Sequence, residues 1–201
     1  MKKQIVLIHG GDTFANYDEY LSFLNEFQID FERYRAPSVN WKRTLGVALG
    51  NDYEIISPDM PDKNNAKYLE WKIWFEKFVP HLDPQVILIG HSLGGIFLAK
   101  YLSENTLPKS VLATFLVAAC YDDKDSDYSL ADFVLPDKLD NFAKQSSKIF
   151  LYHSSDDKVV PFSDLAKYQK ALPNATTRTF TDRGHFNQET FPELVEDIKG
   201  L

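Results

Sequence analysis

The stretch VILIGHSLGGIFLAKYL, residues 86–102, constrains the fold of this chain more than any other. It begins as a short run rich in β-branched residues, turns through glycines, and continues with the apolar pattern of a buried helix. A buried strand that passes directly into a helix is typical of proteins with a parallel sheet. Ser92 lies at the sharpest point of this turn, between Gly90 and Gly94.

Segments of the same kind recur along the chain. The expected strands are IVLI (5–8), YEIIS (53–57), VILIG (86–90), VLATFLV (111–117), KIFLY (148–152) and, as an edge strand, TTRTF (176–180). Continuous apolar runs of this length suit strands that are buried on both faces of a parallel sheet. With helical segments between them, they predict the α/β class, with a mostly parallel central sheet of about six strands and helices on both faces.

Three stretches between the strands repeat apolar residues at helical spacing. They are Tyr17, Tyr20, Leu21 and Leu24; Ala66, Leu69, Ile73, Trp74 and Phe78; and Phe191, Leu194, Val195 and Ile198. In the last stretch, Thr190 and Glu193 have the spacing of a capping box. Pro192 falls in the first turn, and Gly200 follows the end. We expect each helix to bury its apolar face.

Size and charge narrow the class of protein. The 201 residues, 44% of them hydrophobic, suit one domain over residues 1–201, with irregular insertions at about 30–50 and 121–145 that we expect to be loops or lids. The net charge of −7 argues against nucleic-acid binding, which needs a basic face. One local basic cluster is present: Arg33, Arg35, Lys42 and Arg43.

Cysteine usage and the apolar runs bear on the compartment. Because Cys120 is the only cysteine, neither an internal disulfide nor a multi-cysteine zinc site can form. The chain starts MKKQIVLIHGG, whose apolar run is too short for a secretory signal, and no stretch is long enough to span a membrane. We therefore expect a cytoplasmic protein.

The setting of Ser92 favours a nucleophile. Gly-His-Ser-Leu-Gly matches the nucleophile elbow, in which a tight strand-to-helix turn lifts the serine hydroxyl clear of the sheet. The first N–H groups of the following helix point into the same space, where they can stabilise an oxyanion. The alternative is a glycine turn in which Ser92 only caps the helix. The strand before it and the apolar helix after it are the context that the catalytic interpretation requires.

A serine nucleophile needs a base, and the base needs an acid to orient it. In this topology they follow later strands, in the order Ser, Asp, His. HSSDDKVVPF follows the fifth expected strand and TDRGHFN the sixth, which offers Asp156 or Asp157 as the acid and His185 as the base. The alternative for His185 is an ordinary surface-loop histidine. Of the other histidines, His9 and His91 lie in turns beside the site, where we expect structural hydrogen bonding. His81 sits at a helix end beside Pro80, and His153 precedes the acid loop, on the wrong side in chain order.

The oxyanion hole needs two N–H donors. Leu93 supplies one by its position directly after the nucleophile. The second is expected from HGGDTF, after the first strand, where we choose Gly11, with Asp12 as the alternative. An ordinary glycine turn is the non-catalytic interpretation of this loop.

In their order along the chain, LIHGG, GHSLGG, DDKVVP and DRGHF resemble the α/β-hydrolase superfamily over nearly its whole length. SPDMPD, YLEWKIWFEKF and GHFNQETFPEL resemble more narrowly the small serine hydrolases grouped with retinoblastoma-binding protein nine and YdeN, although residues 30–50 are longer than that group usually carries. In related hydrolases the spacing Asp-x-x-Val-Pro marks the acid, which favours Asp157 and leaves Asp156 to brace the loop. The resemblance implies Ser92, Asp157 and His185 as the catalytic residues.

The expected reaction is hydrolysis of a carboxylic ester, or a related acyl bond, through an acyl-enzyme on Ser92. It requires a small-molecule acyl substrate and neither a metal nor an organic cofactor. The candidates for an apolar acyl site are Phe14, Tyr17, Tyr121 and Phe162. The aspartates of residues 121–140, if they overhang this site, would disfavour polyanionic substrates. The alternative from another class is a binding protein that keeps this fold with little or no catalysis.

Overall fold

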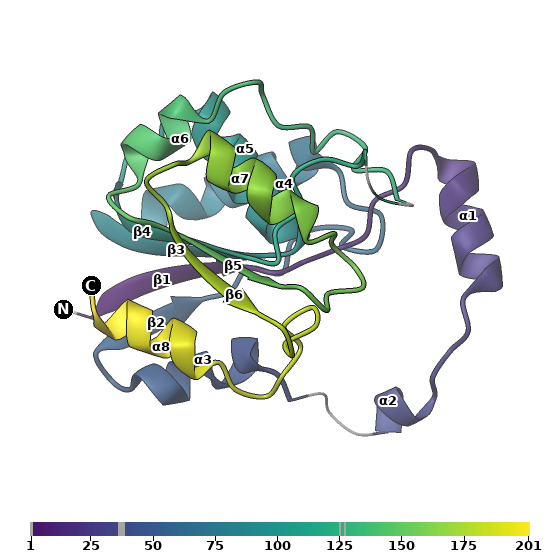
Figure 1. The fold of residues 1–201 in the computed structure, drawn as a ribbon, viewed down its shortest axis with the longest axis horizontal. Coiled ribbons are helices and arrows are strands. Elements are labelled where there is room, and N and C mark those ends of the chain that lie inside the picture. Colours follow the sequence, from purple (N-terminus) through teal and green to yellow (C-terminus); the bar gives the residue numbers. More distant parts are fainter. Residues whose placement is uncertain (1, 36–38, 125, 127) are drawn as a thin grey trace.

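The computed structural model describes residues 2–35, 39–124, 126 and 128–201, without the side chain of Arg33. The protein is built around a six-stranded sheet in which every pair of neighbours is parallel, in the order β2-β1-β3-β4-β5-β6 (Figure 1). The strands are β1 (Lys3–Ile8), β2 (Tyr53–Ile56), β3 (Gln85–His91), β4 (Ser110–Val117), β5 (Ile149–Ser154) and β6 (Thr176–Phe180). The predicted parallel sheet is confirmed, with TTRTF at its edge.

Helices cover both faces of this sheet (Figure 1). On one face lie α4 (Tyr68–Phe78), α5 (Leu93–Glu104), α6 (Asp140–Gln145) and α7 (Ser163–Ala171), with the 3-10 helix η1 (Val79–His81) after α4. On the other face lie α3 (Trp41–Leu49) and α8 (Pro192–Lys199). Side chains along a strand alternate between the two faces. Odd-numbered residues of β1 and β3 therefore face α3 and α8, and this parity extends to the ends of both strands.

The strand β3 and the helix α5 form the most buried part of the fold. From Leu93 to Leu102, every residue of α5 except Lys100 is buried. This burial explains why the segment is apolar on nearly all sides rather than amphipathic. Each large side chain buried here, such as Phe97, contributes about 1.5–3 kcal/mol to folding.

None of the helices in the described part of the chain has the length and apolar character to cross a membrane.

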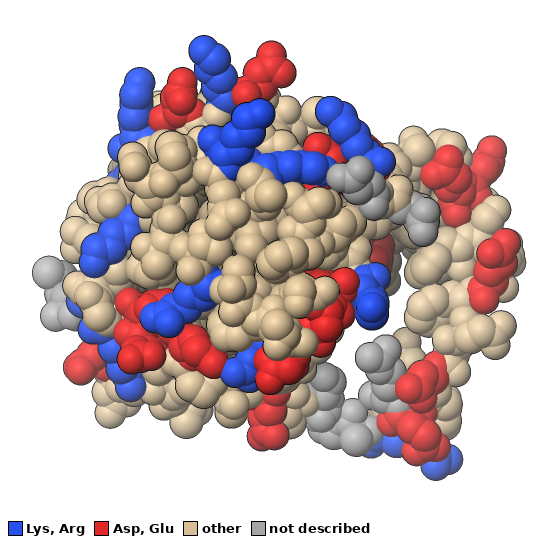
Figure 2. Space-filling view, in the orientation of Figure 1, with Lys and Arg blue, Asp and Glu red and all other residues tan. Residues whose placement is uncertain are grey.

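The segment between β1 and α3 leaves the body of the molecule. Residues 15–35, which we call the arm, hold α1 (Tyr17–Glu26) and α2 (Glu32–Arg35) and stand apart from the sheet (Figures 1 and 2). The predicted helix forms, but the expectation that it buries an apolar face is wrong, because none of the residues of α1 is buried. Leu21 and Leu24 are exposed.

Aromatic contacts attach the arm to the loop after β1. The Phe14 ring lies 5.3 Å from the Tyr20 ring and 5.1 Å from the Phe23 ring, between centroids. On the sheet face shared with α8, the covering helix is α3 and not α1: α3 buries Trp41 and Leu45 there. The arm is therefore left without a surface of its own on the sheet.

The two insertions are more regular than expected. Within residues 30–50, α3 is a packed helix and not a loop. Within residues 121–145, α6 packs on α5 through the buried Phe142, while the stretch before it stays irregular. Each insertion therefore supplies a helix to one face of the sheet. Asp125 and Asp127, which belong to the acidic segment, lie outside the described residues.

The buried face of α4 differs from the predicted one. Tyr68, Trp71 and Phe75 point into the core, whereas Leu69, Ile73 and Trp74 are exposed. The helical period fits either set. The inward set carries three aromatic rings, which bury more apolar area. The Trp71 Nε1–H also donates to the Pro61 carbonyl at 2.8 Å, and an indole N–H needs such a partner when it is buried.

The start of α8 also differs from the prediction. Its N-cap residue is Phe191, no side chain caps the helix, and Pro192 takes the first position. Thr190 and Glu193 therefore do not form the predicted capping box. The Glu193 carboxylate instead lies 2.6 Å from an Arg183 guanidinium nitrogen, in the loop that carries His185. This ion pair ties α8 to that loop.

Candidate active site

Ser92 occupies a strained turn between β3 and α5. Its backbone has φ 55° and ψ −123°, a conformation that L-residues rarely adopt and that costs about 1–3 kcal/mol. Its N–H donates to the Val117 carbonyl at 2.9 Å, which fixes the turn against β4. A Cβ on Gly94 would clash with the backbone oxygens of Ile8 and His9, so only glycine permits β1 and α5 to approach this closely. The glycine frame of the motif therefore has a steric cause.

Asp157 and His185 are brought together by the loops after β5 and β6. His185 Nδ1 lies 2.8 Å from Asp157 Oδ2. The other carboxylate oxygen of Asp157 accepts hydrogen bonds from the Val159 and Val160 amides at 2.8 and 3.1 Å. The Asp157 side chain is 0% exposed and that of His185 is 12% exposed. The imidazole is thus oriented by a fully buried carboxylate while keeping a path to solvent or ligand.

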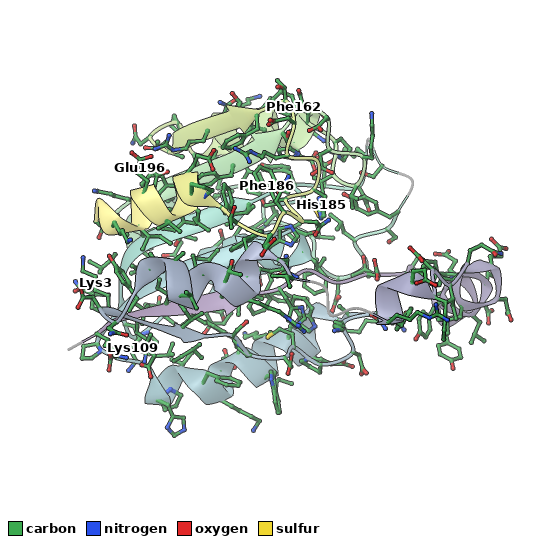
Figure 3. The ribbon with its side chains drawn as sticks, turned by 90° about the horizontal axis from the view of Figure 1, so that it is seen from below. Lys3, Lys109, Phe162, His185, Phe186 and Glu196 are labelled. Carbon is green, nitrogen blue, oxygen red and sulfur yellow. The ribbon has the colours of Figure 1, made fainter. Side chains whose placement is uncertain are left out.

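Two buried donors hold the backbone around His185. His91 Nε2 donates to the His185 carbonyl at 2.9 Å, and Trp41 Nε1 donates to the Phe186 carbonyl at 2.8 Å. Phe186 has φ 52°, so this loop is itself strained. His185 and Phe186 lie side by side at the end of the sheet opposite Lys3, where the strands end (Figure 3). The backbone position of His185 therefore depends on α3 and on the residue before Ser92.

Asp156 makes a different set of contacts from Asp157. Its Oδ1 accepts from the Ser154 hydroxyl and, at 2.9 Å, from the Gly184 amide. These hydrogen bonds, led by that from Ser154, lower the pKa of Asp156 below its usual value. Asp156 thus braces the turn that leads into His185, whereas Asp157 contacts the imidazole.

The remaining histidines near the site are occupied by backbone groups. His9 Nε2 accepts from the Met60 amide at 2.9 Å, and its Nδ1 donates to the Gly10 carbonyl. His153 Nε2 donates to the Val160 carbonyl at 3.1 Å. Burial lowers the pKa of His9, His91 and His153. These rings are therefore neutral near pH 7 and hold the loops in place.

Gly11 and Leu93 both lie at the wall of the site. A Cβ on Gly11 would stand 2.6 Å from the Lys63 carbonyl and 3.3 Å from a Leu93 methyl group, so the two loops meet at this glycine. The Asp12 amide is already committed, because it donates to the Lys63 carbonyl at 2.8 Å. That bond argues against the alternative oxyanion donor.

A cavity of about 300 Å³ opens beside Ser92. Its walls come from the loops after β1, β4 and β5, from the start of α5 and from α1 of the arm. The lining residues are Gly11, Asp12, Thr13, Phe14, Glu19, Phe23, Ser92, Leu93, Cys120, Tyr128, Ser129, Leu130, Val159 and Val160. Of the expected aromatic lining, only Phe14 faces this cavity; Tyr17, Tyr121 and Phe162 do not.

The acidic segment contributes to the cavity without its charges. Residues 128–130 line it, but none of the described aspartates of residues 121–140 does. Asp123 accepts from the Leu130 amide, and Asp132 accepts from the Tyr68 amide at the start of α4. These carboxylates satisfy backbone donors, so the expected repulsion of polyanions has no support here.

Two gaps in the expected arrangement stand out. Among the described residues, Ser92 Oγ makes no hydrogen bond with His185. The role of Trp41 in holding the His185 loop was not predicted, because its contact spans 145 residues and leaves no local signal in the sequence.

No group of three or more His, Cys, Asp or Glu side chains within the described ranges could hold a metal ion.

Comparisons with known proteins identify the family of this chain. A protein-family model described as serine hydrolase matches residues 35–195, which include Ser92, Asp157 and His185. Serine hydrolase RBBP9 from Rattus norvegicus is 28% identical over 151 residues, or 74% of this chain and 78% of that protein.

Solved structures share the fold. The ydeN gene product from B. subtilis matches with a TM-score of 0.73 and 17% identity, over 99% of this chain and 98% of that one. The esterase EaEST from Exiguobacterium antarcticum matches with a TM-score of 0.63 and 14% identity, over 98% and 91%. The fold is thus that of an α/β hydrolase. Because the family model spans more than half of its length, this chain belongs to the serine hydrolase family.

Proposed function

We propose that this protein hydrolyses a carboxylic ester of a small molecule through an acyl-enzyme on Ser92. The observation that carries the proposal is the 2.8 Å contact between His185 Nδ1 and the buried Asp157 carboxylate, at the sheet edge where Ser92 is held at φ 55° on a cavity wall. The parallel sheet brings these three loops to one edge, and an acid, a base and a nucleophile on them are the groups that acyl transfer requires.

Proton transfer follows from the tautomer that Asp157 imposes. The carboxylate accepts a hydrogen bond from the Nδ1–H, so Nε2 of His185 carries a lone pair and acts as the base. As Ser92 Oγ forms its bond to the carbonyl carbon, its proton passes to Nε2. His185 then gives this proton to the leaving alkoxide, and a water molecule repeats the sequence to release the acid. Nε2 must reach Oγ in the substrate complex, where catalytic hydrogen bonds commonly tighten.

The oxyanion is stabilised by two backbone donors. The N–H of Leu93 is the first of α5, and the second donor is the N–H of Gly11 in the loop packed against Leu93. Neither amide is needed by another carbonyl in the described structure, in contrast to Asp12. The developing negative charge therefore meets preorganised dipoles.

The cavity supports a modest acyl group. Its volume of about 300 Å³ lies at the small end of ligand sites, and Phe14, Phe23, Leu130 and Val160 supply apolar walls. We therefore place the acyl chain of the substrate in this cavity. An ester carbonyl would then stand beside Ser92, with the alcohol part directed away from the cavity.

A serine-directed fluorophosphonate tests the proposal. We expect intact-protein mass to show one adduct on the wild type, none on Ser92→Ala, and strongly slowed labelling of His185→Ala. A panel of esters of increasing acyl length would then define the substrate. Absence of an adduct on folded wild type would contradict the proposal and favour a binding protein with a hydrolase fold.

A further inference from the structure

Lys42 is a half-buried cation for which the described residues supply no acidic partner. It lies in the first turn of α3, whose start is fixed to the His185 loop by the Trp41 amide, at 2.8 Å from the Gln188 carbonyl, and by the Trp41 indole. Its Nζ stands over the Trp41 ring, 5.1 Å from the centroid. No carboxylate of the described residues pairs with it. A lysine in such a place is uncommon, because burying an unpaired charge is unfavourable.

This cation lies close to the catalytic turn. The Trp41 ring over which Lys42 Nζ stands lies 6.1 Å from the His91 ring, between centroids. His91 directly precedes Ser92. Burial and the nearby charge of Lys42 lower the pKa of His91. His91 is the last residue of β3 and lies on the face that looks toward α3. Lys42 therefore stands on the α3 side of Ser92. The apolar cavity is lined instead by α1 and the loops after β1, β4 and β5.

The surroundings of Lys42 hold a second unmet polar group. The side-chain oxygen of Asn40, the N-cap residue of α3, is buried and has no hydrogen-bond partner among the described residues. Burial lowers the pKa of Lys42 to about 8, which leaves it mostly protonated at neutral pH. Lys42 is still partly exposed, so a ligand can reach it.

We propose that Lys42 binds an anionic oxygen group, such as a carboxylate, on the alcohol side of the substrate of Ser92. The inference rests on the proposed function for the placement of the acyl group in the cavity. An anionic group would supply the negative charge that none of the described carboxylates places beside Lys42. A half-buried lysine that contacts no described acid is explained by such a ligand.

Binding is measured first, without catalysis. In the Ser92→Ala protein, which cannot form an acyl-enzyme, we expect 3-hydroxybenzoate to bind about tenfold more tightly than phenol in calorimetric titrations. Lys42→Met removes this preference, Lys42→Arg keeps it, and Arg43→Met, at the exposed neighbouring position, leaves it unchanged. Equal binding of the two ligands to the Ser92→Ala protein, or equal effects of the Lys42→Met and Arg43→Met substitutions, would overturn the proposal.

Turnover supplies the second test. Phenyl and 3-carboxyphenyl esters of one short acid share the acyl group and differ in charge on the alcohol side. We expect Lys42→Met to lower kcat/KM about tenfold for the charged ester, mainly through KM, and to leave the neutral ester unaffected. If neither ester is cleaved by wild type while the charged ligand still binds, the proposed function fails and the anion site stands.

Thermal stability distinguishes ligand binding by Lys42 from a purely structural role. Because Lys42→Met removes a half-buried charge that no described carboxylate pairs with, we expect its Tm to equal or exceed that of wild type. A lower Tm together with unchanged ligand preference would mean that Lys42 serves only the packing of α3, which contradicts the proposal.

Discussion

Strained backbone and buried donors concentrate where the strands end. Ser92 and Phe186 both have positive φ, and each is held by hydrogen bonds to its backbone from a different element. Strain of this kind persists only when the surroundings over-determine it. At the residue scale, the site therefore depends on positioning groups such as Trp41 and His91 as much as on the residues that would contact substrate.

Trp41→Phe tests this positioning role. The substitution keeps a ring in the core but leaves the Phe186 carbonyl without its donor, so we expect a loss of about 1–2 kcal/mol in the free energy of unfolding. We also expect kcat to fall about tenfold with KM unchanged, because the base is displaced and substrate contacts are not. Trp74→Phe, at a tryptophan that is 40% exposed on α4, is the matched control and leaves both quantities unchanged. A parallel rise in KM would contradict the positioning role.

The adjacent aspartates are expected to separate in kinetics. Asp157→Asn leaves the imidazole without the carboxylate that sets its tautomer, and we expect kcat for the best ester to fall by about 10³–10⁴. Asp156→Asn retains an oxygen for the Gly184 amide and lowers kcat by less than about tenfold. Circular dichroism of both variants checks folding. Equal losses would show that the acid of the site is not Asp157.

At the element scale, one polar cluster joins α8 to the sheet edge. The Asp197 carboxylate on α8 accepts from Arg178 Nε on β6 at 2.6 Å and from the Tyr152 hydroxyl on β5. Burial alone would raise the pKa of Asp197, but the hydrogen bonds from Arg178 and Tyr152 outweigh it and hold the pKa below its usual value. The charged carboxylate is thus favoured in the folded state.

Stability is therefore expected to change with pH through Asp197. A lowered pKa contributes stability above the unfolded-state value, near pH 4, and the contribution is lost as the pH falls through the folded-state value. Allowing for solvent around the half-exposed Arg178, we expect Asp197→Asn to cost about 1 kcal/mol at pH 7 in urea unfolding, with a smaller difference at pH 3. Asp182→Asn, at a side chain that is 77% exposed, is the control. A difference that grows toward acid pH would refute this assignment.

The strands were predictable from the sequence because short runs rich in β-branched residues favour buried strands of a parallel sheet. TTRTF at residues 176–180 and VLATFLV at 111–117 fall within one residue of β6 and β4. Helix faces were less predictable. In α4 the same period fits Leu69 or Trp71, and only contacts with distant residues decide between them. The position of α1 likewise depends on α3 having covered the sheet face.

The loops of the candidate site followed from topology. In a parallel sheet, all carboxyl ends meet at one edge, so loops after β1, β3, β5 and β6 converge wherever the motifs fall along the chain. The contact between Asp157 and His185 follows from this rule. The dependence of His185 on Trp41 does not, because it rests on the packing of α3 against a loop 145 residues away.

At the scale of the whole molecule, the sheet and the arm differ in the support that they receive. A helix of 10 residues with none buried has little tertiary packing to hold it, and isolated helices shorter than about 12–15 residues are marginal in water. We expect amides of α1 to exchange with deuterium within seconds, while those of β3 and α5 exchange only through global unfolding. Mass spectrometry of peptic fragments measures this directly. Slow exchange in α1 would show that it packs on a surface that the isolated chain does not present.

The exposed apolar side chains of the arm also bear on how the protein behaves at high concentration. Tyr17, Leu24 and Phe31 are at least about half exposed, and the net charge of −7 keeps copies apart at pH 7. At the sequence pI of about 5.2 the net charge and its repulsion disappear, and arms of neighbouring copies can associate through their exposed apolar side chains. We expect light scattering of the wild type to rise sharply near this pH. Scattering of the Leu21→Glu, Leu24→Glu double variant, measured at the pI of that variant, is expected to stay low. Colloidal stability would then be a property of the arm, separable from the fold that carries the site.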